Sequence, residues 1–266
     1  MPTVSLPSVS SLLENNGTGP GWGALIDGDL IPVNPRNAGV RVPSIFGSNT
    51  QEGTLALLAE YGSELTTLNQ STYNAFLEYN FGSLASVVNQ TYSLSNFSQA
   101  SLPGYTAMAT VLTDYNYRCS AYRGLIGAAK NGVPAWTYSF AHTPSCSWYE
   151  AIPEVASVLQ LLGPTHTSEL PFVFNITTHL APPNGTCDFT DIEKELAATM
   201  SGIWTHMAAT GNPGDDSIWP EWNATSNPGV NINDDLDVGT VHYSMCYGFW
   251  DATTDEIARI AQPTSD

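Results

Sequence analysis

Two segments of the chain have the character of buried strands, and residues with helical spacing lie between them. Residues 40–46 form an apolar run that ends in the turn-like sequence Gly47-Ser48-Asn49, and residues 133–140 alternate small and aromatic side chains. The intervening apolar residues recur at helical intervals in four segments: 54–61, 71–79, 83–92 and 105–130. We therefore expect a mostly helical, cap-like region over 54–130, after which the chain returns to a sheet.

The clearest helix is predicted for residues 191–210. Thr190 and Glu193 have the spacing of a capping box, and Gly211 stands where the helix would stop. One face of this helix carries apolar side chains at steps of three and four residues: Ile192, Leu196, Met200, Ile203 and Met207. We expect this face to pack into the core, with the methionines as packing residues rather than part of a cofactor site.

The charge balance excludes several classes of partner. The chain has 7 Lys and Arg against 25 Asp and Glu, a formal net charge of −18. Nucleic acids and anionic lipid surfaces need clustered basic residues, and none are present. Hydrophobic residues make up 42% of the chain, which is enough for a packed globular body. The composition suits a soluble protein that works outside the cell.

Cysteines and glycosylation motifs also favour secretion. The four cysteines, Cys119, Cys146, Cys187 and Cys246, are widely spaced and form no Cys-x-x-Cys pair, which favours disulfides over a zinc cluster and leaves three pairings open. Seven Asn-x-Ser/Thr motifs occur, at Asn16, Asn69, Asn89, Asn96, Asn175, Asn184 and Asn223. No apolar run approaches the roughly 20 residues of a membrane span, so no integral membrane segment is expected.

The first residues of the sequence do not fit a secreted protein. Residues 1–5 lack the basic start and the apolar core of a signal peptide. A glycoprotein with disulfides needs a route into the secretory pathway. We therefore expect the natural N-terminus, with its signal peptide, to be missing from this sequence.

Most of the five histidines have simple structural interpretations. His206 lies on the polar side of the predicted 191–210 helix, His142 and His242 end or follow predicted strands, and His179 lies in a loop with glycosylation motifs. No two histidines have the i, i+4 spacing of a helical metal site. His166 differs, because Gly163 precedes it by three residues and the segment 169–174 reads Glu-Leu-Pro-Phe-Val-Phe.

This His segment resembles the type-B carboxylesterases, a family that includes cholinesterases and extracellular fungal lipases. Their general-base His lies in a Gly-x-x-His loop followed by such a segment, so the resemblance implies that His166 is the base. Residues 46–53, Phe-Gly-Ser-Asn-Thr-Gln-Glu-Gly, resemble the family's acid motif and imply that Glu52 is the catalytic acid. The alternative for Glu52 is a first-turn carboxylate that only complements a helix dipole.

Other elements resemble the family in the same order along the chain. They include Asp27-Gly28 with Ile31-Pro32, the strand-like segment 134–142, the helix segment 200–204, Trp219-Pro220-Glu221-Trp222, and Cys246 with Phe249-Trp250. The resemblance implies the fold class α/β, with residues 1–266 as the C-terminal portion of an α/β-hydrolase domain that has a mainly parallel sheet and a helical cap. It also implies a Cys119–Cys246 disulfide, which leaves Cys146 and Cys187 as a further bridge across the His loop.

The predicted catalytic set is incomplete. An acyl-transfer triad needs a nucleophile, an imidazole and a carboxylate, and in α/β-hydrolases they follow in the order Ser, acid, His. The chain contains no Gly-x-Ser-x-Gly motif and no Gly-rich oxyanion loop. We therefore expect the N-terminal half of the same domain to supply both, and this chain to be inactive alone. The implied reaction is hydrolysis of small-molecule or lipid esters, without cofactor or metal.

Two other functions remain open from the sequence. The first is a catalytically inactive, cholinesterase-like ectodomain, although the presence of both Glu52 and His166 argues against it. The second is a secreted ligand-binding glycoprotein that stacks its ligand on some of its 7 Trp and 12 Tyr residues. Trp148 and Tyr149, near the His166 loop, are the best candidates for a substrate-facing surface.

Overall fold

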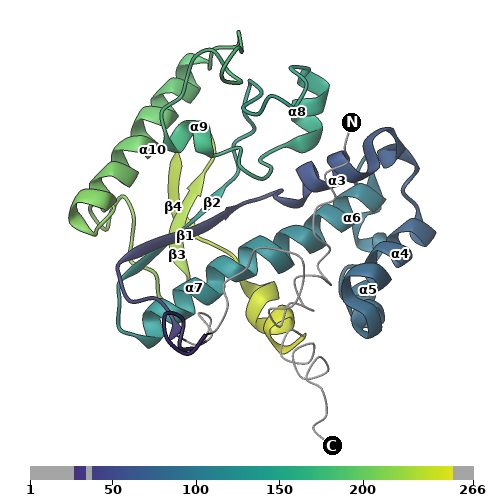
Figure 1. The fold of residues 1–266 in the computed structure, drawn as a ribbon, viewed down its shortest axis with the longest axis horizontal. Coiled ribbons are helices and arrows are strands. Elements are labelled where there is room, and N and C mark those ends of the chain that lie inside the picture. The colour runs from purple at the N-terminus through teal and green to yellow at the C-terminus, as the bar shows by residue number, and fades with distance from the viewer. Residues whose placement is uncertain (1–26, 34–37, 254–266) are drawn as a thin grey trace, which may run out of the picture.

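A four-stranded mixed sheet forms the centre of the molecule (Figure 1). The computed structural model describes residues 27–33 and 38–253. The strands follow the order β1 (Ser44–Asn49), β2 (Ala135–Phe140), β3 (Pro228–Ile232) and β4 (Leu236–Thr240). The first three are parallel, and β4 is antiparallel to β3. Helices flank this sheet, as expected for part of an α/β-hydrolase fold.

The strand β1 begins later than the sequence predicts. Residues 40–46 were the predicted strand, but pairing starts at Ser44, after Pro43, and includes the predicted turn residues 47–49. Gly47 pairs with Tyr138 of β2, and a Cβ on Gly47 would lie 2.3 Å from the Tyr138 ring. The glycine therefore lets an aromatic ring lie across the strand, rather than marking a turn. Among the described residues β1 pairs only with β2, so its outer edge has no strand partner.

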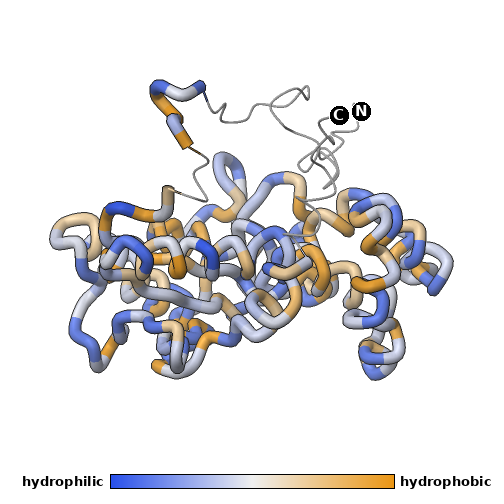
Figure 2. The backbone as a smooth tube through the Cα atoms, turned by 90° about the horizontal axis from the view of Figure 1, so that it is seen from below, coloured by the Kyte–Doolittle hydropathy of each residue, from blue (hydrophilic) through white to orange (hydrophobic). Residues whose placement is uncertain are grey.

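The chain between β1 and β2 is helical, as predicted. Its α-helices are α3 (Gly53–Tyr61), α4 (Gln70–Phe81), α5 (Ala85–Thr91), α6 (Pro103–Leu112) and α7 (Cys119–Lys130). Short 3₁₀ segments occupy Gly62–Thr67, Gly82–Leu84 and Leu94–Phe97, and a π-helical turn, Thr113–Arg118, separates α6 from α7. The predicted 105–130 helix is therefore two helices joined by this turn. Polar and apolar residues alternate along much of the backbone, as in elements with one buried face (Figure 2).

The second helical group follows β2 and contains α8 (Ala156–Leu162), α9 (Leu170–Val173) and α10 (Asp191–Thr210). The bounds and the capping box of α10 are as predicted. The predicted core face is wrong at one end, because Ile192 is 57% exposed while Leu196 and Met200 are buried. Glu193 takes the inward position in the first turn of α10, where its carboxylate accepts hydrogen bonds from Ser145 in the loop after β2.

Two disulfides connect distant segments. Cys119–Cys246 joins the start of α7 to a C-terminal π-helical turn, Cys246–Trp250. Cys146–Cys187 crosses the segment that contains His166. Both predicted pairings are confirmed.

Candidate active site

Glu52 is the residue before α3 and follows the carboxyl end of β1. Figure 1 shows β1 leading into α3. Its side chain is 8% exposed. The backbone N–H of Asn49, the last residue of β1, donates to Glu52 Oε1 at 2.8 Å. A buried carboxylate with this fixed donor is held in one orientation. The bond to the end of β1 therefore holds Oε1 of Glu52 and leaves its other oxygen, Oε2, pointing away from the strand.

His166 lies beside this carboxylate. His166 Nδ1 is 2.8 Å from Glu52 Oε2, although the two residues are 114 positions apart. Because a carboxylate accepts, Nδ1 carries the proton and Nε2 is the nitrogen available for chemistry. The hydrogen bond that His166 donates to Glu52 raises the pKa of His166, nearby carboxylate charge raises it further, and burial opposes both. The pair has the geometry of a general base and the carboxylate that orients it.

Hydrogen bonds fix the His loop to the start of α3. Gln51 N donates to Pro164 O at 3.0 Å, and Leu55 N donates to Thr165 Oγ1 at 2.9 Å. Thr54 Oγ1 donates to the carbonyl of Leu162 at 2.7 Å, just before the loop. Residues on both sides of Glu52 therefore bind the residues that immediately precede His166. The separation between the two side chains depends on backbone contacts as well as on their own hydrogen bond.

Asn49 and Glu169 belong to the site, but the sequence reasoning gave neither of them a role. Asn49 Nδ2 donates to Thr165 O at 2.6 Å and to Glu169 Oε2 at 2.5 Å. Burial raises the pKa of Glu169. Asn49 thus holds Glu52 through its backbone and the residue before His166 through its side chain. The available signal was position, because both residues lie inside the two motifs that contain Glu52 and His166.

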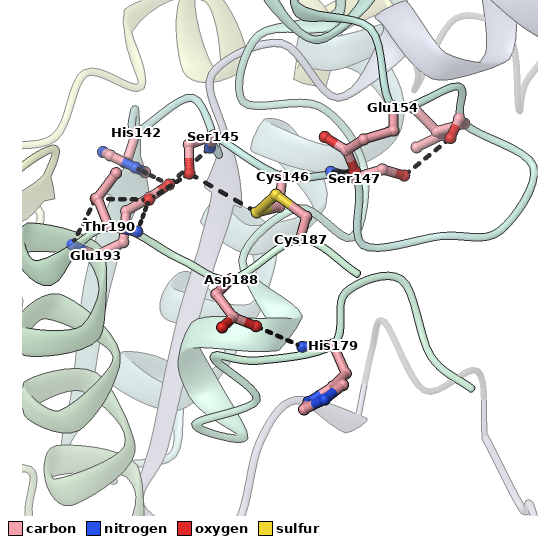
Figure 3. The surroundings of a disulfide bond; sticks show 11 residues. His142, Ser145, Cys146, Ser147, Glu154, His179, Cys187, Asp188, Thr190 and Glu193 are labelled. Carbon is pink, nitrogen blue, oxygen red and sulfur yellow. Dashed lines mark hydrogen bonds and ion pairs between the residues drawn. A yellow bond between two sulfur atoms is a disulfide. The ribbon is translucent and has the colours of Figure 1, made fainter. Parts of the chain in front are cut away.

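His142 lies in a separate polar network around Glu193 (Figure 3). One ring nitrogen, Nε2, faces Glu193 Oε1 at 3.2 Å. The other, Nδ1, faces Asp234 Oδ1 at 3.0 Å. Ser145 and Thr190 each donate to Glu193 through both backbone N–H and hydroxyl. Burial raises the pKa of Glu193, but the hydrogen bonds from His142, Ser145 and Thr190 lower it to about 2. His142 therefore has a structural role in this network, in line with its structural interpretation from the sequence. Three other histidines, His179, His206 and His242, are exposed.

An apolar groove of about 520 Å³ opens beside His166. Trp148 and Tyr149 line it, as does Thr167, whose hydroxyl accepts a hydrogen bond from Trp148 Nε1 at 3.0 Å. A second cavity, of about 410 Å³, lies along β1 and is lined by Ile45, Gly47 and Glu52 among others. The predicted ligand-facing aromatics therefore do lie next to the candidate base.

Comparison with known proteins assigns the family. The model of the carboxylesterase family matches residues 8–250. The chain belongs to the carboxylesterase family. Similar proteins include gut esterase 1 of Caenorhabditis briggsae, 24% identical over 72% of this chain, and para-nitrobenzyl esterase of Bacillus subtilis, 26% identical over 74%. Acetylcholinesterase 1 of Caenorhabditis elegans is 27% identical over 47% of this chain.

The chain is much shorter than these carboxylesterase relatives. It spans 37% of the gut esterase, 36% of the para-nitrobenzyl esterase and 19% of the acetylcholinesterase. The activity of a whole carboxylesterase is therefore a proposal for the protein that contains this chain.

The remaining predicted site residues lie on the surface or outside the described part. Within residues 27–33 and 38–253, no group of three or more His, Cys, Asp or Glu side chains is placed to hold a metal ion. No helix in these ranges is long and apolar enough to cross a membrane.

Among the predicted glycosylation sites, Asn89 is half-buried, Asn16 lies outside the described residues, and the others are exposed: Asn69, Asn96, Asn175, Asn184 and Asn223.

Proposed function

We propose that this chain supplies the acid and the base of a Ser-His-Glu carboxylic ester hydrolase. Glu52 is the acid, His166 is the base, and the serine comes from a part of the protein outside these 266 residues. The observation that carries the proposal is the 2.8 Å contact between His166 Nδ1 and Glu52 Oε2 at the carboxyl end of β1, in a chain of the carboxylesterase family. Two relatives, gut esterase 1 and para-nitrobenzyl esterase, are named as esterases, which supports an ester as the substrate.

In this proposal, His166 Nε2 removes the proton of the serine hydroxyl while the oxygen attacks the ester carbonyl. His166 then gives that proton to the leaving alcohol, and an acyl-enzyme remains. Water, deprotonated by the same nitrogen, attacks the acyl-enzyme, and His166 then returns that proton to the serine oxygen as the carboxylic acid leaves. Glu52 keeps the proton of His166 on Nδ1 and stabilises the imidazolium in both steps.

The proposal also requires oxyanion donors from outside this chain. One such donor contributes on the order of 3 kcal/mol to transition-state stabilisation. Because the sequence also has no Gly-x-Ser-x-Gly motif, we expect the 266-residue chain alone to hydrolyse esters no faster than its buffer.

The decisive experiment uses the full-length protein that contains this chain. It should hydrolyse p-nitrophenyl acetate and react with a fluorophosphonate probe, and His166→Gln should lower kcat by at least about a thousandfold. His206→Gln, an exposed histidine on α10, is the matched control and should retain activity. If the wild-type protein is inert to both reagents, the inactive ectodomain or the ligand-binding glycoprotein is the better function.

We further infer that the protein is secreted and glycosylated. Two disulfides and the exposed asparagines of the glycosylation motifs support this. Peptide N-glycosidase treatment of the native protein should lower its apparent mass and convert the modified asparagines to aspartate. A protein with no mass change would contradict the inference.

A further inference from the structure

The groove beside His166 is bordered by several large apolar side chains that remain partly exposed. Phe174 is 69% exposed, and Tyr149, Leu170 and Ile176 are also exposed. Although the chain carries 25 acidic residues, no described Asp or Glu lines this groove. Such a lining favours an uncharged apolar group over a cation or an anion.

The walls of the groove are fixed by interactions behind them. On one wall, Ser147 N donates to Glu154 (Figure 3). Ser147 Oγ donates to the carbonyls of Tyr149 and Ile152, and together these bonds hold the turn that contains Trp148. Trp148 Nε1 also donates to Thr167 Oγ1, one residue beyond His166. The indole therefore has a fixed position relative to the imidazole.

A second part of the groove lining, at Leu180, is tied to this wall by the disulfide Cys146–Cys187. Leu180 lines the groove and exchanges both backbone hydrogen bonds with Cys187, at 2.9 and 3.1 Å. Cys146 lies two residues before Trp148. The disulfide thus connects the segments that contribute Trp148 and Leu180. A groove whose walls are linked in this way is formed before a ligand enters, which lowers the entropy cost of binding.

We propose that this groove binds the alcohol portion of the substrate ester, and that the preferred alcohol is an uncharged alkyl or aryl alcohol. The inference rests on the proposed ester hydrolysis. Glu52 occupies Nδ1 of His166, so Nε2 is the nitrogen that protonates the leaving alcohol. The alcohol oxygen must therefore reach the imidazole, and a substituent on that oxygen meets the apolar surface that begins at His166.

Two substrate series in the full-length protein test this assignment. The first varies the alcohol in methyl, butyl and benzyl acetate, and the second varies the acyl chain in p-nitrophenyl acetate, butyrate and octanoate. Phe174→Ala should lower the ratio of kcat/KM for benzyl acetate to that for methyl acetate about tenfold, because apolar contact to the alcohol is lost. Leu170→Trp should lower the same ratio by filling the groove. The control is Tyr79→Ala, which truncates a 64%-exposed aromatic on α4 and should leave the ratio unchanged.

The possible outcomes separate this inference from the proposed function. If wild-type protein hydrolyses none of the esters, the proposed function fails. If it hydrolyses them and neither Phe174→Ala nor Leu170→Trp changes the benzyl-to-methyl ratio, the groove assignment is overturned and the function stands. A change confined to the acyl series would assign the groove to the acyl chain instead. A lower melting temperature of Phe174→Ala with an unchanged ratio would show that another protein segment covers the groove, which also overturns the assignment.

Discussion

Replacement of Glu193 by glutamine tests the polar network at the start of α10. The Glu193 side chain is 2% exposed, and its two oxygens accept hydrogen bonds from Ser145, Thr190 and His142. Glutamine has nearly the same shape but places an NH₂ group where a second acceptor is needed. A donor would then face donors inside the protein, which is more destabilising than the loss of one exposed hydrogen bond.

The size of the effect follows from the pKa of Glu193. It is lowered from 4.5 to about 2, and each pKa unit corresponds to about 1.4 kcal/mol, so the ionised carboxylate contributes about 3 kcal/mol to the free energy of unfolding. A lowered pKa means that this contribution is complete above pH 4.5 and is lost as the pH falls toward 2. The free energy of unfolding of Glu193→Gln should therefore be about 3 kcal/mol lower than that of the wild type at pH 7, and this difference should vanish near pH 2.

Urea unfolding of wild type and variant at pH 7, 4 and 2.5 measures this difference. Glu195→Gln is the matched control, because Glu195 is exposed on the same helix and its replacement should change the free energy by less than about 0.5 kcal/mol. A Glu193→Gln deficit below about 1 kcal/mol at pH 7 would refute the reasoning. A deficit of the same size at pH 7 and pH 2.5 would also refute it, since the loss would then not depend on the carboxylate charge.

Three further predictions concern the site and its framework. In the full-length protein, Glu52→Gln should lower kcat by about 10⁴. Because Glu52 is the main cause of the raised pKa of His166, the acid limb of the kcat/KM profile should also move to lower pH, and an unmoved limb would contradict that cause. Asn49→Ala should lower kcat about tenfold or more with little change in KM, because the variant loses the hydrogen bonds to Thr165 and Glu169. Equal changes in kcat and KM would argue that Asn49 does not position His166. Replacing both cysteines of Cys119–Cys246 by alanine opens a loop with a sequence separation of 127 residues. The free energy of unfolding, measured in urea, should fall by about 4 to 5 kcal/mol. A loss below about 1 kcal/mol would show that the unfolded chain gains little conformational freedom.

The sequence predicts the helices of this fold better than its strands. The α10 helix could be placed to the residue because Thr190, Glu193 and Gly211 mark its ends by local chemistry. The start of β1 could not, since strand bounds depend on pairing with a distant segment. Gly47 has the local signature of a turn, and only the neighbouring ring of Tyr138 explains why glycine stands inside a strand.

The candidate acid and base were predictable because short motifs surround each of them. What the motifs do not give is the second set of contacts. Asn49 Nδ2 reaches across more than a hundred residues to Thr165 O, and no local pattern in either segment encodes that distance. The exposure of Ile192 has the same origin, because helical periodicity cannot show that Glu193 also finds two donors on Ser145 in a distant loop, in addition to the two on its own N-cap, Thr190.

The segment between β2 and α10 shows why such long-range contacts matter for His166. Over residues 141–190 it contains only the short helices α8 and α9 and a single isolated β-bridge, so its own secondary structure supplies few of the bonds that hold a loop in place. The Glu193 network fixes the beginning of this segment at Ser145 and its end at Thr190, and Cys146–Cys187 joins the residues just inside those points. The disulfide and the Glu193 carboxylate thus each join the two ends of the segment that contains His166. A change that weakens either connection should increase the motion of His166 relative to Glu52 under conditions in which the sheet is still folded.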